Sequence, residues 1–355
     1  MLQFSGGNVY PRIIALALAS CVILTSCEDE PTESPCPDGS TGQWNQLDVH
    51  PEWVTALELT NSELVVSGGV SGVFVQSPPI CGEFEFAGSA FPELALGILS
   101  YGAYRLAVVD DSLYRGFRGP INHIPVECGG LAPPFGSTPC SDGITPRQLN
   151  DMMGLPSGEL LLCTSSSVYL KSRHSASWQV TLTGLFFDAT FSRGAAAKLY
   201  LATRGPGINL LHRSLDSGRS WQRLTPIWPA GAGPGDIRSL ATTSTGDTVL
   251  AATATSVLLS TDGGTSFSAL RPVGAPAVVR IEPQAPSRCL VLADSLFESR
   301  DLGITWAARS LPGRLLLPAR GEMTSLPMDV SWESNRLVIG RLGNDNAEVW
   351  WCELD

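Results

Sequence analysis

The side chains that could carry chemistry in this chain are few. It has four histidines and nine cysteines in 355 residues, and no two cysteines have the Cys-x-x-Cys spacing of a metal site. We therefore expect neither a metal nor a cofactor. Three arginines, Arg147, Arg238 and Arg280, fall at or near predicted strands and are candidates to face a ligand. The alternative is that they pair with acids of the fold, namely Asp188, Asp236 or Asp329.

The first 26 residues form a predicted signal peptide. Arg12 precedes an apolar run, 13–24, that is too short to be a comfortable membrane span. The run ends in Leu24-Thr-Ser-Cys27, which resembles the lipobox of bacterial lipoproteins and implies that Cys27 carries a lipid. Cys21 also fits the pattern, but cleavage there would shorten the apolar run. The alternative is an ordinary secretory signal, and both interpretations predict export.

Beyond the signal peptide the sequence predicts a flexible tether over residues 27–41, rich in Glu, Pro, Ser and Thr, and then a domain that begins at residue 42. Export permits disulfides in that domain. Cys128 and Cys140 lie in one irregular insertion, so a disulfide between them is expected to close its loop. Cys163 and Cys289 fall on predicted inner strands, where we expect them to be small buried hydrophobes.

The elements that must position these side chains are short strands, joined by one eight-residue turn that occurs three times. The turn reads Ser-x-Asp-x-Gly-x-Ser/Thr-aromatic, and its copies at 214–221, 260–267 and 299–306 are called the box turns below. The Asp can accept backbone N–H groups, the Gly permits φ > 0, and the aromatic begins the next strand. The pattern residues are Ser214, Asp216, Gly218, Trp221, Ser260, Asp262, Gly264, Phe267, Ser299, Asp301, Gly303 and Trp306.

This pattern resembles the Asp-box (BNR) repeat of sialidases, sortilin-type receptors and propeller-type photosystem assembly factors. The aromatics of successive copies lie 46 and 39 residues apart (221 to 267, then 267 to 306), which is a spacing typical of propeller blades. The resemblance implies a β-propeller in which the box turns are structural and the chemistry of those families lies elsewhere.

The strand pattern outside the box turns also predicts a propeller. Pairs of short apolar strands, such as 63–66 with 72–75, recur about once per 40–50 residues. We count seven pairs, and each would be the middle of a four-stranded antiparallel blade. The chain ends after strand 347–352 without a fourth strand, whereas 42–47 is an outer strand without a blade. We therefore predict an all-β fold in which residues 42–355 form one seven-bladed β-propeller, with the N-terminal strand closing the ring in the last blade.

Ring closure would bring Cys36 close to Cys352, so a disulfide between these two is a further prediction.

The candidate ligand surface is the face opposite the box turns. The long connections between outer strands and the next blade, at 118–146, 224–236 and 310–327, would all rise on that face. Trp228 lies among Pro and Gly in the second of them and is a candidate contact residue; the alternative is that it packs over a blade edge.

The net charge and the motifs of the sequence reduce the number of functions that it could have. A net charge of −11 argues against nucleic acid as a partner. A sialidase would need three arginines, a Tyr nucleophile with a Glu partner and an Asp acid, and its Arg-Ile/Leu-Pro signature is missing here. We therefore expect a monomeric, lipid-anchored binding or assembly scaffold of the cell envelope, whose partner is a protein or a glycan. The alternative is a sialidase-like or other glycoside hydrolase.

Overall fold

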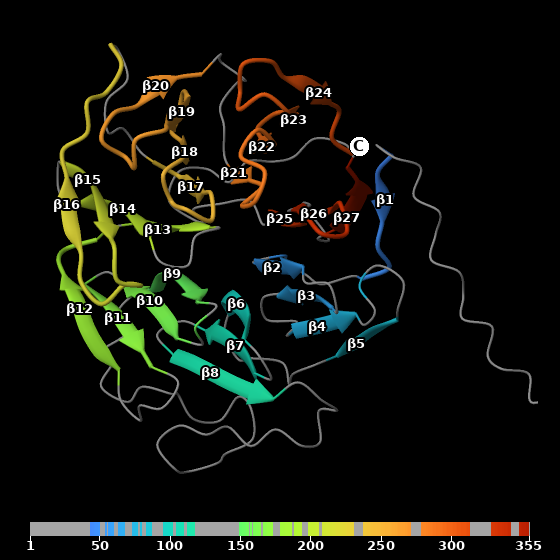
Figure 1. Cartoon of the computed structure of the whole chain (residues 1–355). Helices are drawn as coiled ribbons and strands as arrows, with labels where there is room; N and C mark the ends of the chain where they lie inside the picture. The colour runs from blue at the N-terminus through green and yellow to red at the C-terminus, as the bar shows by residue number, and fades with distance from the viewer. Residues whose placement is uncertain are drawn as a thin grey trace, which may run out of the picture. The chain divides into compact units, whose positions relative to one another are not determined.

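The computed structural model describes residues 43–354, except for several segments. The longest of these are 87–94, 118–148, 231–236, 271–277, 313–327 and 342–347, and for the strands between 95 and 117 the backbone alone is described. The chain divides into two compact units, Met1–Pro35 and Cys36–Asp355, and the first lies outside the described residues. The described part of the second unit contains 27 strands and no helix (Figure 1), which confirms the all-β prediction. No helix among the described residues is long and apolar enough to cross a membrane.

Most strands belong to antiparallel sheets whose strand order follows the chain. Three four-stranded sheets are formed by β2 (Ala56–Leu59), β3 (Leu64–Ser67), β4 (Val73–Gln76) and β5 (Phe84–Phe86), by β9 (Leu149–Gly154), β10 (Leu160–Thr164), β11 (Ser167–Lys171) and β12 (Gln179–Thr183), and by β21 (Val278–Ile281), β22 (Cys289–Leu292), β23 (Leu296–Ser299) and β24 (Ala307–Arg309). A three-stranded sheet is formed by β6 (Ala95–Tyr101), β7 (Tyr104–Val109) and β8 (Ser112–Phe117).

One sheet has eight strands because two antiparallel halves are joined side by side. The halves are β13 (Asp188–Arg193), β14 (Leu199–Gly205), β15 (Ile208–Ser214) and β16 (Gln222–Leu224), and β17 (Ser239–Thr242), β18 (Val249–Ala252), β19 (Val257–Ser260) and β20 (Ser268–Ala269). They meet through a short parallel pairing of β13 with β17, in which Ser192 lies opposite Leu240 and Arg193 opposite Ala241.

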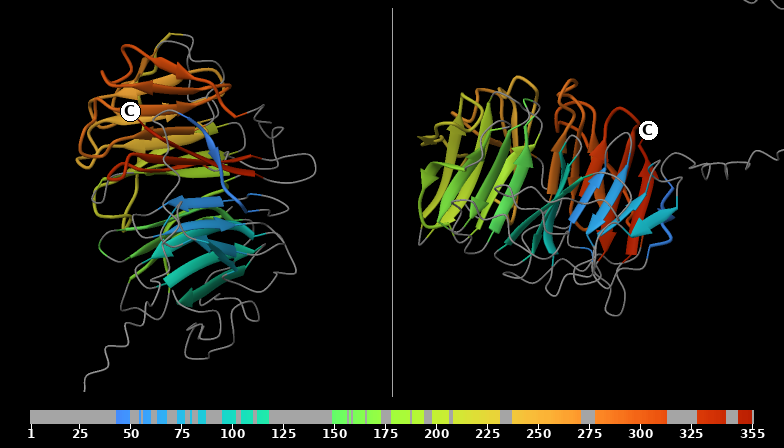
Figure 2. Two further views of the ribbon diagram at one scale, coloured as in Figure 1. Left: turned by 90° about the vertical axis from the view of Figure 1, so that its right-hand side faces the viewer. Right: turned by 90° about the horizontal axis from the view of Figure 1, so that it is seen from below.

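The last sheet combines the two ends of the domain. It contains β25 (Met328–Ser331), β26 (Arg336–Arg341), β27 (Glu348–Glu353) and, as its outer strand, β1 (Asn45–Gln46). β1 pairs antiparallel with β27, with Asn45 opposite Trp351 and Gln46 opposite Trp350, and the Trp44 indole donates a 2.7 Å hydrogen bond to the carbonyl of Ser310. Both views of Figure 2 place the blue N-terminal strand beside the red C-terminal strands.

The first strands of the sheets contact one another in chain order. β2 contacts β6, β6 contacts β9, and the series continues through β13, β17 and β21, while β25 contacts β2. Polar side chains reinforce three of these contacts by accepting a backbone N–H from the next first strand. The acceptors are Asp151 for Phe191 (2.7 Å), Ser239 for Val279 (3.2 Å) and Asp329 for Leu59 (2.8 Å).

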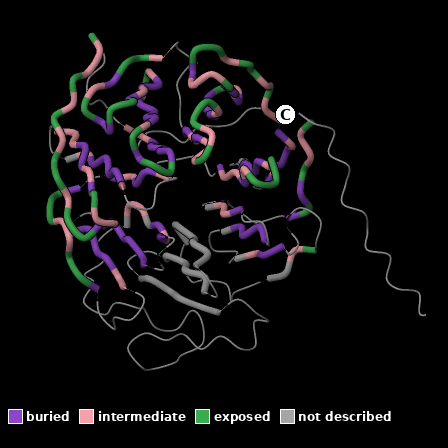
Figure 3. The backbone as a smooth tube through the Cα atoms, in the orientation of Figure 1, coloured by how far each residue is buried: buried purple, intermediate pink, exposed green. Residues whose placement is uncertain are grey.

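The apolar core lies between neighbouring sheets. For example, Leu161 and Cys163 of β10 pack with Phe191 of β13 and Leu201 of β14 in one buried cluster. Every residue of β10 is buried, as expected for a strand that has protein on both faces. In Figure 3 buried residues accordingly follow the inner strands, and exposed residues follow the outer strands and the turns.

The three box turns have the same hydrogen bonds. In the turn 260–267, the Ser260 hydroxyl donates to Asp262 Oδ1 (2.8 Å) and accepts the Gly264 N–H (2.9 Å), and the Ser266 N–H and hydroxyl donate to the two Asp262 oxygens (2.9 and 2.6 Å). Equivalent bonds occur in the other two turns. The Ser266 hydroxyl, together with its N–H, lowers the pKa of Asp262 to about 2. Each turn therefore holds an ionised Asp at its centre.

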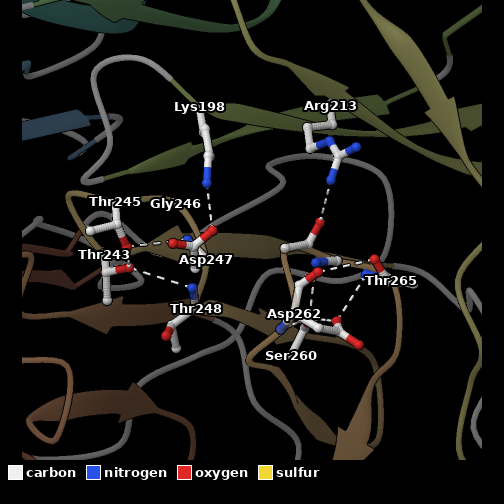
Figure 4. A network of polar contacts seen from close by, with 12 residues as sticks. Lys198, Arg213, Thr243, Thr245, Gly246, Asp247, Thr248, Ser260, Asp262 and Thr265 are labelled. Carbon is white, nitrogen blue, oxygen red and sulfur yellow. Dashed lines mark hydrogen bonds and ion pairs between the residues drawn. The ribbon is translucent and has the colours of Figure 1, made fainter.

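Each box turn also packs on the four-stranded sheet, or the four-stranded half of the large sheet, that precedes it in the chain. A Cβ on Gly218 would lie 2.7 Å from Leu161 of β10, and one on Gly303 would lie 2.5 Å from Leu270, just after β20. The turn 260–267 is held in the same way (Figure 4), because Arg213 of β15 donates a 3.1 Å hydrogen bond to the carbonyl of Gly263. The box turns thus connect neighbouring sheets as well as neighbouring strands.

Candidate functional site

A polar pocket lies where four first strands converge. It has a volume of about 70 Å³ and is lined by residues of β9, β13 and β21 and by residues at and just before β17. Its charged lining residues are Asp151, Arg193, Arg238 and Arg280. The sequence predicted two of the arginines, and the pocket brings these two together; Arg147 lies outside the described residues.

The first charged pair in the pocket is Arg193 with Asp151. Asp151 of β9 accepts the Phe191 N–H of β13 through one oxygen, and through the other it accepts a 2.8 Å hydrogen bond from Arg193 Nη2. The Asp151 side chain is 15% exposed and that of Arg193 is 37% exposed, so this ion pair borders the solvent. The carboxylate therefore has two structural partners and links two sheets.

The second charged pair is Arg280 with Asp329. Arg280 Nη1 and Nη2 donate to the carbonyls of Val279 (3.0 Å) and Met328 (2.7 Å), and its Nε lies 4.0 Å from Asp329 Oδ1. Burial raises the pKa of Asp329, and the positive charge of Arg280 opposes this rise. The alternative that the sequence left open for Arg280, pairing with an acid of the fold, is the one that occurs.

Arg238 differs from the other two arginines. It lies just before β17, where its backbone N–H donates a 2.8 Å hydrogen bond to the carbonyl of Ala252, and its side chain is half-buried. Among the described residues its guanidinium has neither a hydrogen bond nor an ion pair. Asp236, its predicted alternative partner, lies outside those residues.

Sequence reasoning missed Arg193 and Asp151 as members of this site. Asp151 lies within β9 and Arg193 is the last residue of β13, and a charged residue on the first strand of a sheet is a signal that could have pointed to a polar site between sheets. Their contact depends on the pairing of different sheets, which no local pattern specifies. In the part of the chain that the structure describes, no group of three or more His, Cys, Asp or Glu residues is placed to hold a metal ion.

Of the two positions that the sequence left open for Trp228, packing against a neighbouring element is the one that occurs. Its ring stacks on Phe267 of a box turn, with centroids 4.8 Å apart and planes at 12°, and the preceding Ile227 exchanges backbone hydrogen bonds with Thr265 and Phe267 of the same turn. Trp228 therefore packs beside the box turn in the second half of the same eight-stranded sheet. The reason is that β16 has only three residues, so the chain reaches the neighbouring turn at once.

Two of the predicted cysteine positions are described in full. Cys163 and Cys289 are completely buried on β10 and β22, as expected for small hydrophobes. Burial raises the pKa of the Cys289 thiol to about 12. Cys352 is buried on β27, but Cys36 lies outside the described residues, so their disulfide stays a prediction. The same holds for lipidation of Cys27 and for the pair Cys128 and Cys140.

Comparison with known proteins supports the fold alone. No protein-family model matches the sequence, and no curated protein matches it significantly. Similar solved structures include YCF48 from Cyanidioschyzon merolae, with a TM-score of 0.60 and 10% identity over 88% of this chain and 99% of that one. The computationally designed protein Ika8 has a TM-score of 0.54 and 9% identity over 86% of this chain and 98% of the designed one.

A third similar structure is the extracellular domain of the one-component system BT4673 from B. thetaiotaomicron. Its TM-score is 0.58 and its identity 9%, over 87% of this chain and 40% of that one. The fold of this chain is thus a β-propeller. At sequence identities this low, structural similarity indicates the fold and gives no information about activity.

Proposed function

We propose that this chain is an exported, lipid-anchored β-propeller of seven blades that acts as a non-enzymatic binding or assembly scaffold for a protein or a glycan. The pairing of β1 with β27 and the chain-order contacts of the first strands support a ring closed by the N-terminal strand. The likeness to an extracellular domain and the lipobox-like sequence before Cys27 support export.

The observation that carries the binding role is the pocket between the first strands. It lies on a rigid base of paired strands, and it holds one arginine, Arg238, whose guanidinium has no partner among the described residues. Strands position a site more precisely than loops do, and a half-buried guanidinium that has no partner among the described residues keeps donors that a ligand can occupy. A ligand-binding role accounts for both features.

A glycoside hydrolase is the second candidate, because three arginines and one carboxylate share the pocket. Hydrolysis by this class needs two carboxyl groups on either side of the bond that breaks. Among the described lining residues Asp151 is the one acid, and it already accepts hydrogen bonds from Phe191 and Arg193. Binding is therefore the better supported of the two functions.

Anchoring is tested by replacing Cys27 with Ser in the full chain and measuring how the protein divides between membrane and soluble fractions. We expect Cys27→Ser to move the protein out of the membrane fraction, whereas the matched variant Cys21→Ser should stay with it. Membrane partitioning that is unchanged in Cys27→Ser would sink the anchoring proposal.

The scaffold role is tested by crosslinking in the intact cell envelope, followed by capture of the chain and identification of what is bound. A panel of glycosidase substrates, assayed on the same preparation, tests the alternative. We expect a defined protein or glycan partner and no turnover. Turnover that depends on Asp151 would favour the hydrolase.

A further inference from the structure

Among the described residues, the charges of the pocket leave one unit of positive charge uncompensated. Arg193 is paired with Asp151 at 2.8 Å, and Arg280 lies 4.0 Å from Asp329, so each of these two arginines has an acid beside it. Arg238 has no such acid among the described residues. The described residues of the pocket thus match one negative charge, and a dianion would bring an excess charge into a confined site.

The N–H donors of the three pocket arginines also differ in whether they are already hydrogen-bonded. Arg280 already donates to two backbone carbonyls, and Arg193 donates to Asp151. These two arginines contribute positive potential but have donors already in use. The planar guanidinium of Arg238 has a pair of N–H groups that no described residue occupies, and this geometry matches the two oxygens of a carboxylate.

We propose that Arg238 binds the carboxylate of a small monocarboxylic acid in this pocket, with Arg193 and Arg280 supplying the surrounding positive potential. The inference rests on the proposed binding function and names the chemistry of its ligand. The carboxylate belongs either to a free small acid or to the end of a larger molecule whose remainder stays outside the pocket.

The size of the pocket sets the limit on what enters. A volume of about 70 Å³ corresponds to a few water molecules, since one water needs roughly 10–15 Å³ by the same measure. A carboxylate with one or two attached carbons matches a space of this size, and the remainder of a larger ligand would extend outside it. A glycan would therefore reach Arg238 only through an acidic substituent.

The test is a calorimetric titration of the full chain with acetate, and with acetamide and sulfate as matched probes. We expect saturable binding of acetate that weakens as salt is raised, and no saturable binding of neutral acetamide or of the sulfate dianion. Acetamide or sulfate binding as tightly as acetate would overturn the proposal, as would the absence of acetate binding. This comparison uses the unaltered chain and needs no variant to fold.

A variant then assigns the site. Arg238→Gln should raise the Kd for acetate about 10-fold to 100-fold, the range expected for loss of a charge-assisted hydrogen bond. Arg223→Gln, on the exposed outer strand β16, is the matched control and should leave the Kd unchanged. Equal acetate affinity in Arg238→Gln and the unaltered chain would refute the assignment. If Arg238→Gln has a lowered melting temperature, Arg238→Lys is used in its place. Lysine keeps the positive charge but lacks the paired N–H groups of the guanidinium, so this variant should weaken binding less.

Two further experiments distinguish a free acid from the carboxylate of a larger ligand, and distinguish the carboxylate site from the scaffold role. A short peptide and a uronic acid that bind through Arg238 more tightly than acetate would identify a carboxylate at the end of a larger ligand; acetate binding alone would identify a free acid. Capture of an envelope partner without acetate binding would overturn the carboxylate site and leave the scaffold role intact. Acetate binding without any captured partner would support the site and overturn the scaffold.

Discussion

Replacing Gly218 with Ala tests whether the box turns hold neighbouring sheets together. Gly218 has φ of +83°, and a Cβ there would lie 2.7 Å from Leu161, whose side chain is 1% exposed in the core of the preceding sheet. A left-handed non-Gly residue costs about 1–2 kcal/mol, and overpacking a core costs about 1–3 kcal/mol. We therefore expect Gly218→Ala to lower the free energy of unfolding by about 2–5 kcal/mol.

The matched control is Gly263→Ala, one residue before the glycine that is equivalent to Gly218 in the next box turn. Gly263 has φ of +70°, but a Cβ there would meet no atom closer than 3.4 Å. The equivalent positions in the other two turns are Ser217 and Leu302, both at φ of 57°, so a side chain is tolerated there. We expect a loss of about 1 kcal/mol or less, because reduced freedom of the unfolded chain offsets part of the strain.

The assay is urea unfolding of the full chain, followed by tryptophan fluorescence, with both variants compared with the parent chain. Equal losses in Gly218→Ala and Gly263→Ala would refute the reasoning, because only the contact with Leu161 separates them. A second variant makes the test stricter. Adding Leu161→Ala to Gly218→Ala removes the clash, so the two substitutions should couple by about 1 kcal/mol or more.

Three other predictions concern titration and the seam between the chain ends. Burial lowers the pKa of His212, so the unfolded chain takes up a proton below about pH 6.5 while the folded chain does not. The free energy of unfolding should therefore fall as pH drops from 7 to 5. In urea unfolding, His212→Gln should make this pH dependence less steep. The lowered pKa of Asp262, about 2 against an ordinary 3.8, predicts stability that is lost as pH falls from 4 to 2, and acid unfolding of Asp262→Asn should show a smaller loss over that range. Deleting residues 42–49 removes β1 from its pairing with β27 and should lower the melting temperature of the whole domain, whereas deleting residues 28–33 of the predicted tether should not.

Much of the fold could be predicted because its signals are local. The box turn places Ser, Asp, Gly and an aromatic at fixed offsets, and its hydrogen bonds all lie within eight residues, as in Ser260 to Phe267. The outer position of β1 could be predicted because the N-terminal end has a strand without a sheet, whereas the C-terminal end has a sheet that lacks its fourth strand. The burial of the cysteines could be predicted because each has apolar residues on both sides in the sequence.

The site could be predicted only in part because its contacts join distant segments. Asp151 and Arg193 lie on different sheets and meet because β9 contacts β13. The sequence left two positions open for Trp228 because its path depends on where β16 ends, which sequence patterns locate least well. Arg238 was identified as a candidate from its place beside a strand, but whether it had a partner required the structure.

The packing of each box turn on the preceding sheet gives assembly a direction. Leu161 precedes Gly218 in the chain, Arg213 precedes Gly263, and Leu270 precedes Gly303, so each turn meets a surface that was synthesised before it. A chain that crosses a membrane from its N-terminus can therefore dock these sheets one after another as they emerge. β1 is the exception, because it is made first and its partner β27 is made last. In the export that we propose, β1 would have to stay unpaired until the end of the chain arrives.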